Sequence, residues 1–437
     1  MSNTLRKNNN TFYKTQVSDK SRLIEVEIGD SKQDEFYPQI KSLHWDNDAN
    51  FSVRLSDCEG GIASEKDGKI EWVKGKKTSR IYEIDIDEDG GFEFEVELSE
   101  KPSSNVIEYT IQSKNFDFFY QPALTEEQLE VENVRPDNII GSYAVYHKTR
   151  KNNRVGGKAY RTGKAFHIYR PFVEDADNNR VWCDLDINDG LMIITIPQKF
   201  LDEATYPIVI DPTFGYTSVG GSVTTVARNS YCGGKNVTRT GTPATLSSAA
   251  TSIDSLHAYI KSNGWSGTVT TVVMLNVDGG GDPGNHPLEV SSEEEISYTS
   301  TPGWETFDTG LPSGAVDADD YLFSISADPT DIPEDLVEDV NVYYDSTEID
   351  GRYIETFYDD STCYSDSQED PWTPPINIYN NNIHSIYATY SSDALPIQIN
   401  IGDSWKDVES IQINIGDTWK DVTEAKINIG DTWKDIF

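Results

Sequence analysis

The sequence is poor in cysteine and in positive charge. Its four cysteines, spread over 437 residues, are too sparse for a disulfide scaffold, and none stands at the two-residue spacing of a zinc site. The sequence has 36 Lys and Arg residues and 74 Asp and Glu residues, which gives a formal net charge of -38. Because a field of that sign repels polyanions, we do not expect sequence-independent binding of nucleic acid.

Long apolar runs are missing as well. Runs such as residues 191–194 are only a few residues long, whereas a membrane-spanning helix needs roughly 20. The N-terminal sequence MSNTLRKNNNTFYKTQ lacks the apolar segment of a secretory signal, so neither export nor a membrane anchor is expected. Aromatic residues make up 11% of the chain, which predicts that it folds despite its charge.

The first half of the chain alternates apolar and polar residues with a period of two, which is typical of β-strands buried on one face. The clearest case is a hairpin that turns through residues 88–91. Its buried face is predicted to hold Tyr82, Ile84, Ile86, Phe92, Phe94, Val96 and Leu98. Further strands are predicted at residues 106–111, 142–146, 164–169, 181–187, 191–196 and 206–210. The best helix candidate is short, at residues 125–129, where Thr125 begins a Ser/Thr-x-x-Glu/Gln capping pattern.

A change in composition after Asp211-Pro212-Thr213 divides the chain. Residues 214–393 are rich in Gly, Ser and Thr and hold 28 Asp and Glu against 5 Lys and Arg. Strands predicted at residues 255–260, 268–275, 321–325, 340–344 and 383–390 suit one antiparallel sandwich of the jelly-roll kind. The sequence therefore predicts an all-β protein with an N-terminal arm (1–20), a β-rich domain (21–213), an acidic jelly-roll-like β-sandwich (214–393) and a repeat region (394–437).

The C-terminal region repeats every 14 residues. INIGDSWKDV begins at Ile399, INIGDTWKDV at Ile413 and INIGDTWKDI at Ile427. Each copy predicts a β-hairpin with a Gly-Asp turn. Because one hairpin of this size is marginal alone, we expect its Ile and Trp faces to pack on other repeats, on the preceding domain or on other chains. The residues predicted to make these contacts are Ile399, Trp405, Ile413, Trp419, Ile427 and Trp433.

No pattern in the sequence predicts a catalytic, metal or cofactor site. The Asp-x-Asp-x-Asp-Gly pattern at residues 85–90 copies the first half of a calcium loop, but Val96 stands where the loop needs its final Glu. The acidic residues fit the solvent face of a hairpin instead. Gly402-Asp403-Ser404 is similar to the nucleophile block of one class of esterases, but no histidine follows it. The six histidines lack the spacing of metal ligands and stand in no nucleophile motif.

Aromatic residues of the sandwich are candidates for binding sugar rings, since flat aromatic faces pack on the apolar faces of sugars. The candidates are Trp265, Trp304 and Trp372. Core or edge packing explains most Trp and Tyr residues of a β-sandwich, and that interpretation stays open beside the first.

Three motifs stand close together near the middle of the chain: HIYRP at residues 167–171, IPQKFL at 196–201 and YPIVIDPT at 206–213. The block that holds them, residues 164–216, resembles a module of tailed-bacteriophage structural proteins. In that family the block ends a first β domain, and a jelly-roll-like sandwich with a Pro-Gly loop and then a Trp follows. Pro283-Gly284 and Gly303-Trp304 match this order, whereas ADDYL at 318–322 lacks the usual Gly before the aromatic. The C-terminal repeats are also similar to those that end many phage tail and fibre proteins.

The resemblance implies a non-enzymatic structural component of a phage particle: a tail fibre, a tail appendage or a capsid decoration, made in the host cytoplasm and located in the virion. The expected partners are other virion proteins and further copies of the chain, with a trimer as the natural state of a fibre. Two alternatives stay open, a carbohydrate-binding adhesin that grips a host-surface glycan and a polysaccharide depolymerase, which needs a perturbed carboxylate pair in a cleft. We expect no cofactor, nucleic acid or membrane as a partner.

Overall fold

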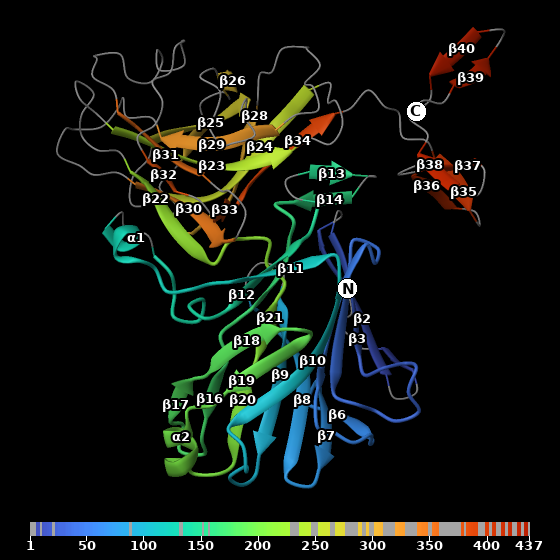
Figure 1. The fold of residues 1–437 in the computed structure, drawn as a ribbon, viewed down its shortest axis with the longest axis vertical. Helices are drawn as coiled ribbons and strands as arrows, with labels where there is room; N and C mark the ends of the chain where they lie inside the picture. Colours follow the sequence, from blue (N-terminus) through green and yellow to red (C-terminus); the bar gives the residue numbers. More distant parts are fainter. Residues whose placement is uncertain are drawn as a thin grey trace.

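The computed structural model of the chain is built almost entirely of antiparallel strands, with two short helices among the residues described (Figure 1). These residues are 6–8, 11–19, 22–86, 90–130, 134–150, 153–155, 158–227, 236–245, 252–262, 267–275, 287–290, 294–296, 301–308, 320–327, 339–347, 352–357, 377–379, 382–391 and the six strands between 398 and 435. The predicted all-β class is confirmed. No helix in these ranges has the length and apolar character needed to cross a membrane.

Two large sheets form the first unit, which fills the lower half of Figure 1. The eight-stranded sheet has the order β1 (Arg6–Asn8), β2 (Thr11–Asp19), β3 (Arg22–Ile28), β4 (Gln39–His44), β5 (Ala49–Leu55), β10 (Val106–Lys114), β19 (Leu191–Thr195) and β18 (Asp184–Asn188). β2, in the region predicted to be an N-terminal arm, pairs with β3 along its length. Strands β4 and β5 bury every second residue, as their alternating sequences require.

The eleven-stranded sheet packs against the first, because buried side chains of both sheets belong to one apolar core. Its main path is β11 (Phe116–Tyr120), β12 (Tyr143–His147), β15 (Lys164–Ile168), β21 (Thr213–Gly215), β9 (Gly91–Leu98), β20 (Ile208–Asp211), β16 (Phe172–Glu174) and β17 (Arg180–Trp182). β8 (Lys77–Ile84), β7 (Lys69–Lys74) and β6 (Ala63–Lys66) extend it from β9. Outside both sheets lie the ribbon of β13 (Asn153–Val155) and β14 (Lys158–Arg161) and the helices α1 (Glu126–Glu130) and α2 (Gln198–Glu203).

Strands β8 and β9 pair as the predicted hairpin, but the predicted buried face is wrong on β8. On β9, residues 92, 94, 96 and 98 are buried as expected. On β8, Ile81 lies opposite Phe94 and is buried, whereas Tyr82 and Ile84 occupy the other face and are half-buried. β8 carries apolar residues at both parities, so alternation alone does not select the core face. Tyr82 instead donates its hydroxyl hydrogen bond to Glu95 and lies under the Lys69 ammonium.

The strand predicted at residues 181–187 is also divided in the structure. β17 belongs to the eleven-stranded sheet and β18 to the eight-stranded sheet. Between them Cys183 is fully buried, and its N–H donates to the Pro171 carbonyl. The chain therefore changes sheets at one residue, and the apolar sequence continues through the change.

The sandwich forms the second unit, in the upper half of Figure 1. Its six-stranded sheet has the order β22 (Ser222–Ala227), β30 (Asp339–Ser346), β24 (Ser252–Ser262) and β28 (Gly303–Asp308), with β33 (Asn382–His384) beside β30 and β34 (Ile386–Ser391) beside β24. Its seven-stranded sheet has the order β26 (Pro287–Val290), β25 (Gly267–Leu275), β29 (Asp320–Ala327), β23 (Asn236–Thr245), β31 (Arg352–Phe357) and β32 (Asn377–Tyr379), with β27 (Glu294–Ile296) beside β25. Consecutive strands from β22 to β25 alternate between the sheets, so the chain crosses the sandwich repeatedly.

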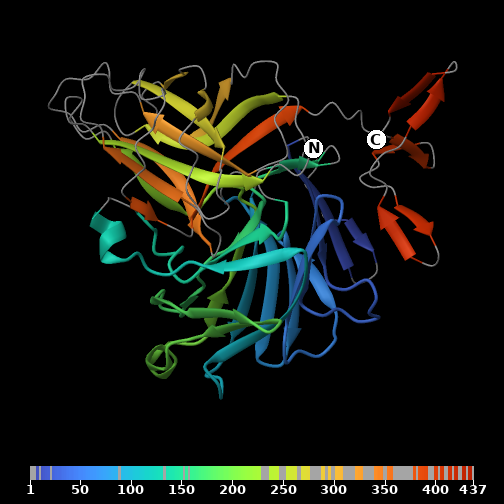
Figure 2. The same cartoon turned by 45° about the horizontal axis from the view of Figure 1, so that its top comes forward.

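Each C-terminal repeat forms a two-stranded antiparallel sheet of its own, which confirms the predicted hairpins. The strands are β35 (Gln398–Ile401), β36 (Ser404–Asp407), β37 (Gln412–Ile415), β38 (Thr418–Asp421), β39 (Lys426–Ile429) and β40 (Thr432–Asp435). Figures 1 and 2 both show these red hairpins at one side of the two larger units.

Candidate functional site

The junction between the first unit and the sandwich holds the most completely buried polar groups of the described chain. At its centre the Lys164 Nζ atom on β15 lies 2.7 Å from the Asp345 Oδ2 atom on β30, and both side chains are fully buried. Both groups of this pair make further hydrogen bonds. Lys164 donates to the Val219 carbonyl at 2.5 Å, and Asp345 accepts hydrogen bonds from the Tyr146 hydroxyl and the Gly221 N–H, each at 2.8 Å.

The electrostatics of the pair follow from this geometry. Burial by itself raises the pKa of the Asp345 carboxyl, but the Lys164 charge and the Gly221 N–H outweigh it, so that the pKa lies below its ordinary value. The carboxylate is therefore charged at neutral pH. A buried ion pair, with further hydrogen bonds to each of its groups, joins β15 of one unit to β30 of the other.

Arg135 forms a second connection across the junction. Its side chain is 7% exposed. The guanidinium donates to the hydroxyls of Ser222 and Ser346, each at 2.7 Å, and to the carbonyl of Pro122. Burial lowers the pKa of Arg135, although Tyr344 and Asp345 act in the opposite direction. Two serines of the sandwich are thus held by one residue of the first unit.

Hydrogen bonds to backbone groups of the sandwich complete the junction. The Gln121 side chain donates to the Ser346 carbonyl at 2.8 Å and accepts from the Ser346 N–H at 2.9 Å. Val134 and Val223 exchange a pair of backbone hydrogen bonds, each at 2.8 Å. These contacts come from segments far apart in the sequence, and they fix the orientation of β22 and β30 on the first unit.

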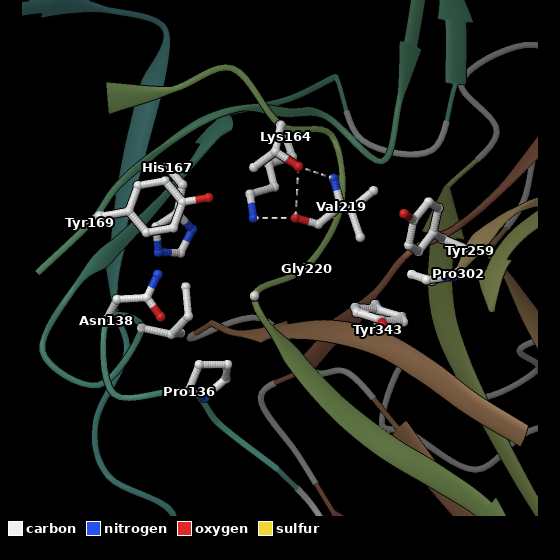
Figure 3. A pocket seen from close by; sticks show the side chains of 13 residues that line it. Pro136, Asn138, Lys164, His167, Tyr169, Val219, Gly220, Tyr259, Pro302 and Tyr343 are labelled. Carbon is white, nitrogen blue, oxygen red and sulfur yellow. Dashed lines mark hydrogen bonds between the residues drawn. The ribbon is translucent and has the colours of Figure 1, made fainter. Parts of the chain in front are cut away.

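A cavity of about 440 Å³ lies beside the ion pair. Figure 3 shows Asn138, His167 and Tyr169 of the first unit on one side and Tyr259, Pro302 and Tyr343 of the sandwich on the other. His167 is fully buried, and its pKa is lowered to about 3 by burial and by the Lys164 charge. The imidazole is therefore neutral at physiological pH.

The predicted sugar-binding tryptophans are described only in part. Trp265 and Trp372 lie outside the described residues. Trp304 is half-buried on β28, and its ring lies edge-on to Tyr259 and Tyr387, with centroids 5.4 and 5.1 Å apart. The guanidinium carbon of Arg161, on β14 of the first unit, lies 5.8 Å from the Trp304 ring centroid. Trp304 is thus part of an aromatic cluster on the sheet face that meets the first unit.

The predicted contact residues of the repeats lie on strands β35 to β40, at equivalent positions in each copy. In the first copy Ile399 pairs with Lys406 and Asn400 pairs with Trp405. Adjacent positions of a strand belong to opposite faces, so the Ile399 and Trp405 positions lie on opposite faces of the hairpin. The same register recurs at Ile413 and Trp419, and at Ile427 and Trp433.

The described part of the chain contains no group of three or more His, Cys, Asp or Glu side chains that could hold a metal ion. The calcium-like pattern at residues 85–90 lies partly outside that part.

Comparison with known proteins adds no relative, because the chain matches no protein-family model and no curated protein.

Proposed function

We propose that the chain is a non-enzymatic structural component of a tailed-phage particle, displayed as a tail fibre, a tail appendage or a capsid decoration. The observation that carries the proposal is the buried junction around Lys164 and Asp345. It holds the sandwich on the first unit by an ion pair and hydrogen bonds between buried polar groups, and a protein that projects a domain from a particle in a fixed direction needs such a connection. The resemblance of residues 164–216 and of the C-terminal repeats to phage structural proteins supports the same role.

In this proposal the first unit attaches to the particle, the acidic sandwich faces outwards, and the repeats contact further copies of the chain or other virion proteins. The high negative charge of residues 214–393 suits an exposed surface, because it keeps the displayed domain soluble and repels other acidic particles. The proposed location is the virion.

The test is co-purification with particles. Phage particles from a host that carries the gene are banded in a density gradient, and their proteins are identified by mass spectrometry. We expect peptides of this chain in the particle band, in constant ratio to the major capsid protein across the fractions. Peptides confined to the unbanded soluble fraction would contradict a structural role.

A carbohydrate-binding adhesin is the second candidate, and the aromatic cluster of Trp304, Tyr259 and Tyr387 favours it. Binding to a glycan array by the purified chain, and its loss on Trp304→Ala, would support this function. An array on which the wild-type chain binds no glycan would count against it.

A further inference from the structure

The cavity at the junction has the size of a ligand site. Its volume of about 440 Å³ falls within the roughly 300 to 1,000 Å³ of typical small-molecule pockets. Residues of both units line it: Lys164 and His167 come from β15, Tyr259 from β24 and Tyr343 from β30 (Figure 3). A molecule bound there contacts the first unit and the sandwich at once.

The charge of the lining favours an uncharged ligand. Lys164 is the one lysine or arginine among the described residues that line the cavity, and the lining includes no aspartate or glutamate. Its ammonium is already paired with Asp345 at 2.7 Å and donates to the Val219 carbonyl. An anion entering the cavity would lose its hydration without gaining an unpaired cation, which is unfavourable.

His167 offers the cavity a hydrogen-bond acceptor. The Ser142 hydroxyl donates its one proton to the Ile139 carbonyl at 2.6 Å, so it accepts from the His167 Nε2–H, 2.6 Å away. The neutral imidazole then carries a lone pair on Nδ1. This buried atom has no hydrogen-bond partner among the described residues. Because an unmade hydrogen bond to a buried acceptor is unfavourable, a hydroxyl that donates to Nδ1 gains affinity.

The opposite wall is aromatic. Tyr259 and Tyr343 pack edge to face, with centroids 5.0 Å apart, and Pro302 lies beside them in the lining. Aromatic surface combined with a few placed polar groups is the usual composition of a small-molecule site. A pyranose matches both walls, since it has an apolar C–H face and hydroxyls at its rim.

We propose that this cavity binds a neutral saccharide unit, with one of its hydroxyls donating to His167 Nδ1 and its apolar ring face packed on Tyr259 and Tyr343. The proposal rests on the geometry of the junction and does not depend on the place of the protein in a particle. It also differs from a glycan site centred on Trp304.

Saturation-transfer NMR and calorimetry on the full-length chain test the proposal. The probes are glucose, galactose, rhamnose and N-acetylglucosamine, with glucuronate as the anionic comparison. We expect at least one neutral sugar to bind, and glucuronate to bind at least about tenfold more weakly, since its carboxylate finds no unpaired cation. Absence of transfer to every neutral sugar at millimolar concentration overturns the proposal.

Variants locate the site. Tyr343→Ala is expected to weaken binding of the sugar about tenfold, the effect of losing an aromatic contact of roughly 1.4 kcal/mol. Tyr120→Ala is the matched control, because Tyr120 is 49% exposed on β11 and does not line the cavity. Binding that survives Tyr343→Ala but is lost on Trp304→Ala would place the site on the aromatic cluster and overturn the cavity assignment.

A direct readout of His167 needs no substitution. In the wild-type chain labelled with ¹⁵N-histidine, we expect the His167 nitrogens to show the Nε2–H tautomer before the sugar is added. The Nδ1 resonance should then shift when the sugar is titrated in, because it gains a donor. A bound sugar that leaves Nδ1 unmoved contradicts the proposed contact, and so does an Nδ1–H tautomer in the free protein.

Discussion

Lys164 and Asp345 are the residues that most directly connect the two units. A buried ion pair contributes little net stability when it is intact, but removing one partner leaves an uncompensated charge in a dry site. We expect Lys164→Met to lower the free energy of unfolding by about 3 to 5 kcal/mol, measured by chemical denaturation. In the double variant Lys164→Met/Asp345→Asn, the free energy of unfolding should fall by less than the sum of the decreases in the two single variants. Neither charge is then left without its partner.

Lys101 and Asp202 provide a matched control. Their Nζ and Oδ1 atoms are also 2.7 Å apart, but each side chain is 51% exposed. Lys101→Met should leave the free energy of unfolding nearly unchanged, since water screens and replaces this pair. If Lys164→Met and Lys101→Met lower the free energy of unfolding equally, burial of the junction pair has no effect on stability.

His167 gives the junction a predicted pH dependence. Its pKa is about 3 in the folded chain and about 6.5 in the unfolded chain. Between these values the unfolded state binds more protons, so the contribution of His167 to the free energy of unfolding rises with pH, by about 1.4 kcal/mol per pH unit. Asp211, whose pKa burial raises to about 6, acts with the opposite sign below that pH.

The measurement therefore compares wild type with His167→Gln in urea between about pH 5 and 6.5, the interval in which unfolded histidine titrates. Asp211 is present in both chains, so its contribution cancels. The difference in unfolding free energy, wild type minus variant, is expected to grow as pH rises. Parallel pH profiles for the two chains would show that His167 is not held neutral in the fold.

No sequence pattern pointed to this site. Lys164 and His167 belong to the block that resembles phage structural proteins, but nothing marks Asp345 among 74 acidic residues. Asp345 acquires its role from three-dimensional placement, when β30 brings it against β15. Among so many acidic residues no single one stands out. Two positions so far apart in the sequence also form no local pattern that would indicate their pairing.

At the scale of elements, alternation located strands better than it located their faces. The hairpin of β8 and β9 was predictable, but Ile81 and Tyr82 are both apolar, so the register decides which one is buried. Likewise, the chain changes sheets at Cys183 without a break in the apolar pattern of the sequence. The helix α1 was predictable, because Thr125 and Gln128 exchange the two capping hydrogen bonds, at 2.9 and 3.2 Å.

Gln121 allows a test of the connection between β11 and β30. Gln121→Ala removes the acceptor of the Ser346 N–H. We expect hydrogen exchange at the Ser346 amide to become about tenfold faster, the factor that corresponds to one hydrogen bond of roughly 1.4 kcal/mol. Gln128→Ala, on the exposed helix α1, is the control and should leave Ser346 unchanged. Unaltered exchange in Gln121→Ala would mean that other contacts alone hold β30 on the first unit.

At the scale of the whole molecule, the three C-terminal hairpins predict self-association. Each is a separate two-stranded sheet, which is marginally stable alone, and its Ile and Trp positions lie on opposite faces. We expect light scattering to give a trimer for the full-length chain and a monomer for a chain that ends at Ala394. A monomer in both cases would contradict assembly through the repeats and would favour a decoration or an adhesin over a fibre.

The most direct test of a structural role in the virion is immunogold electron microscopy. Antibodies raised against the purified chain are applied to intact phage particles from a host that carries the gene. We predict gold at one fixed location on most particles, whether on the tail or on the capsid surface. Particles without gold, in a preparation whose soluble fraction reacts with the same antibodies, would contradict the proposed function.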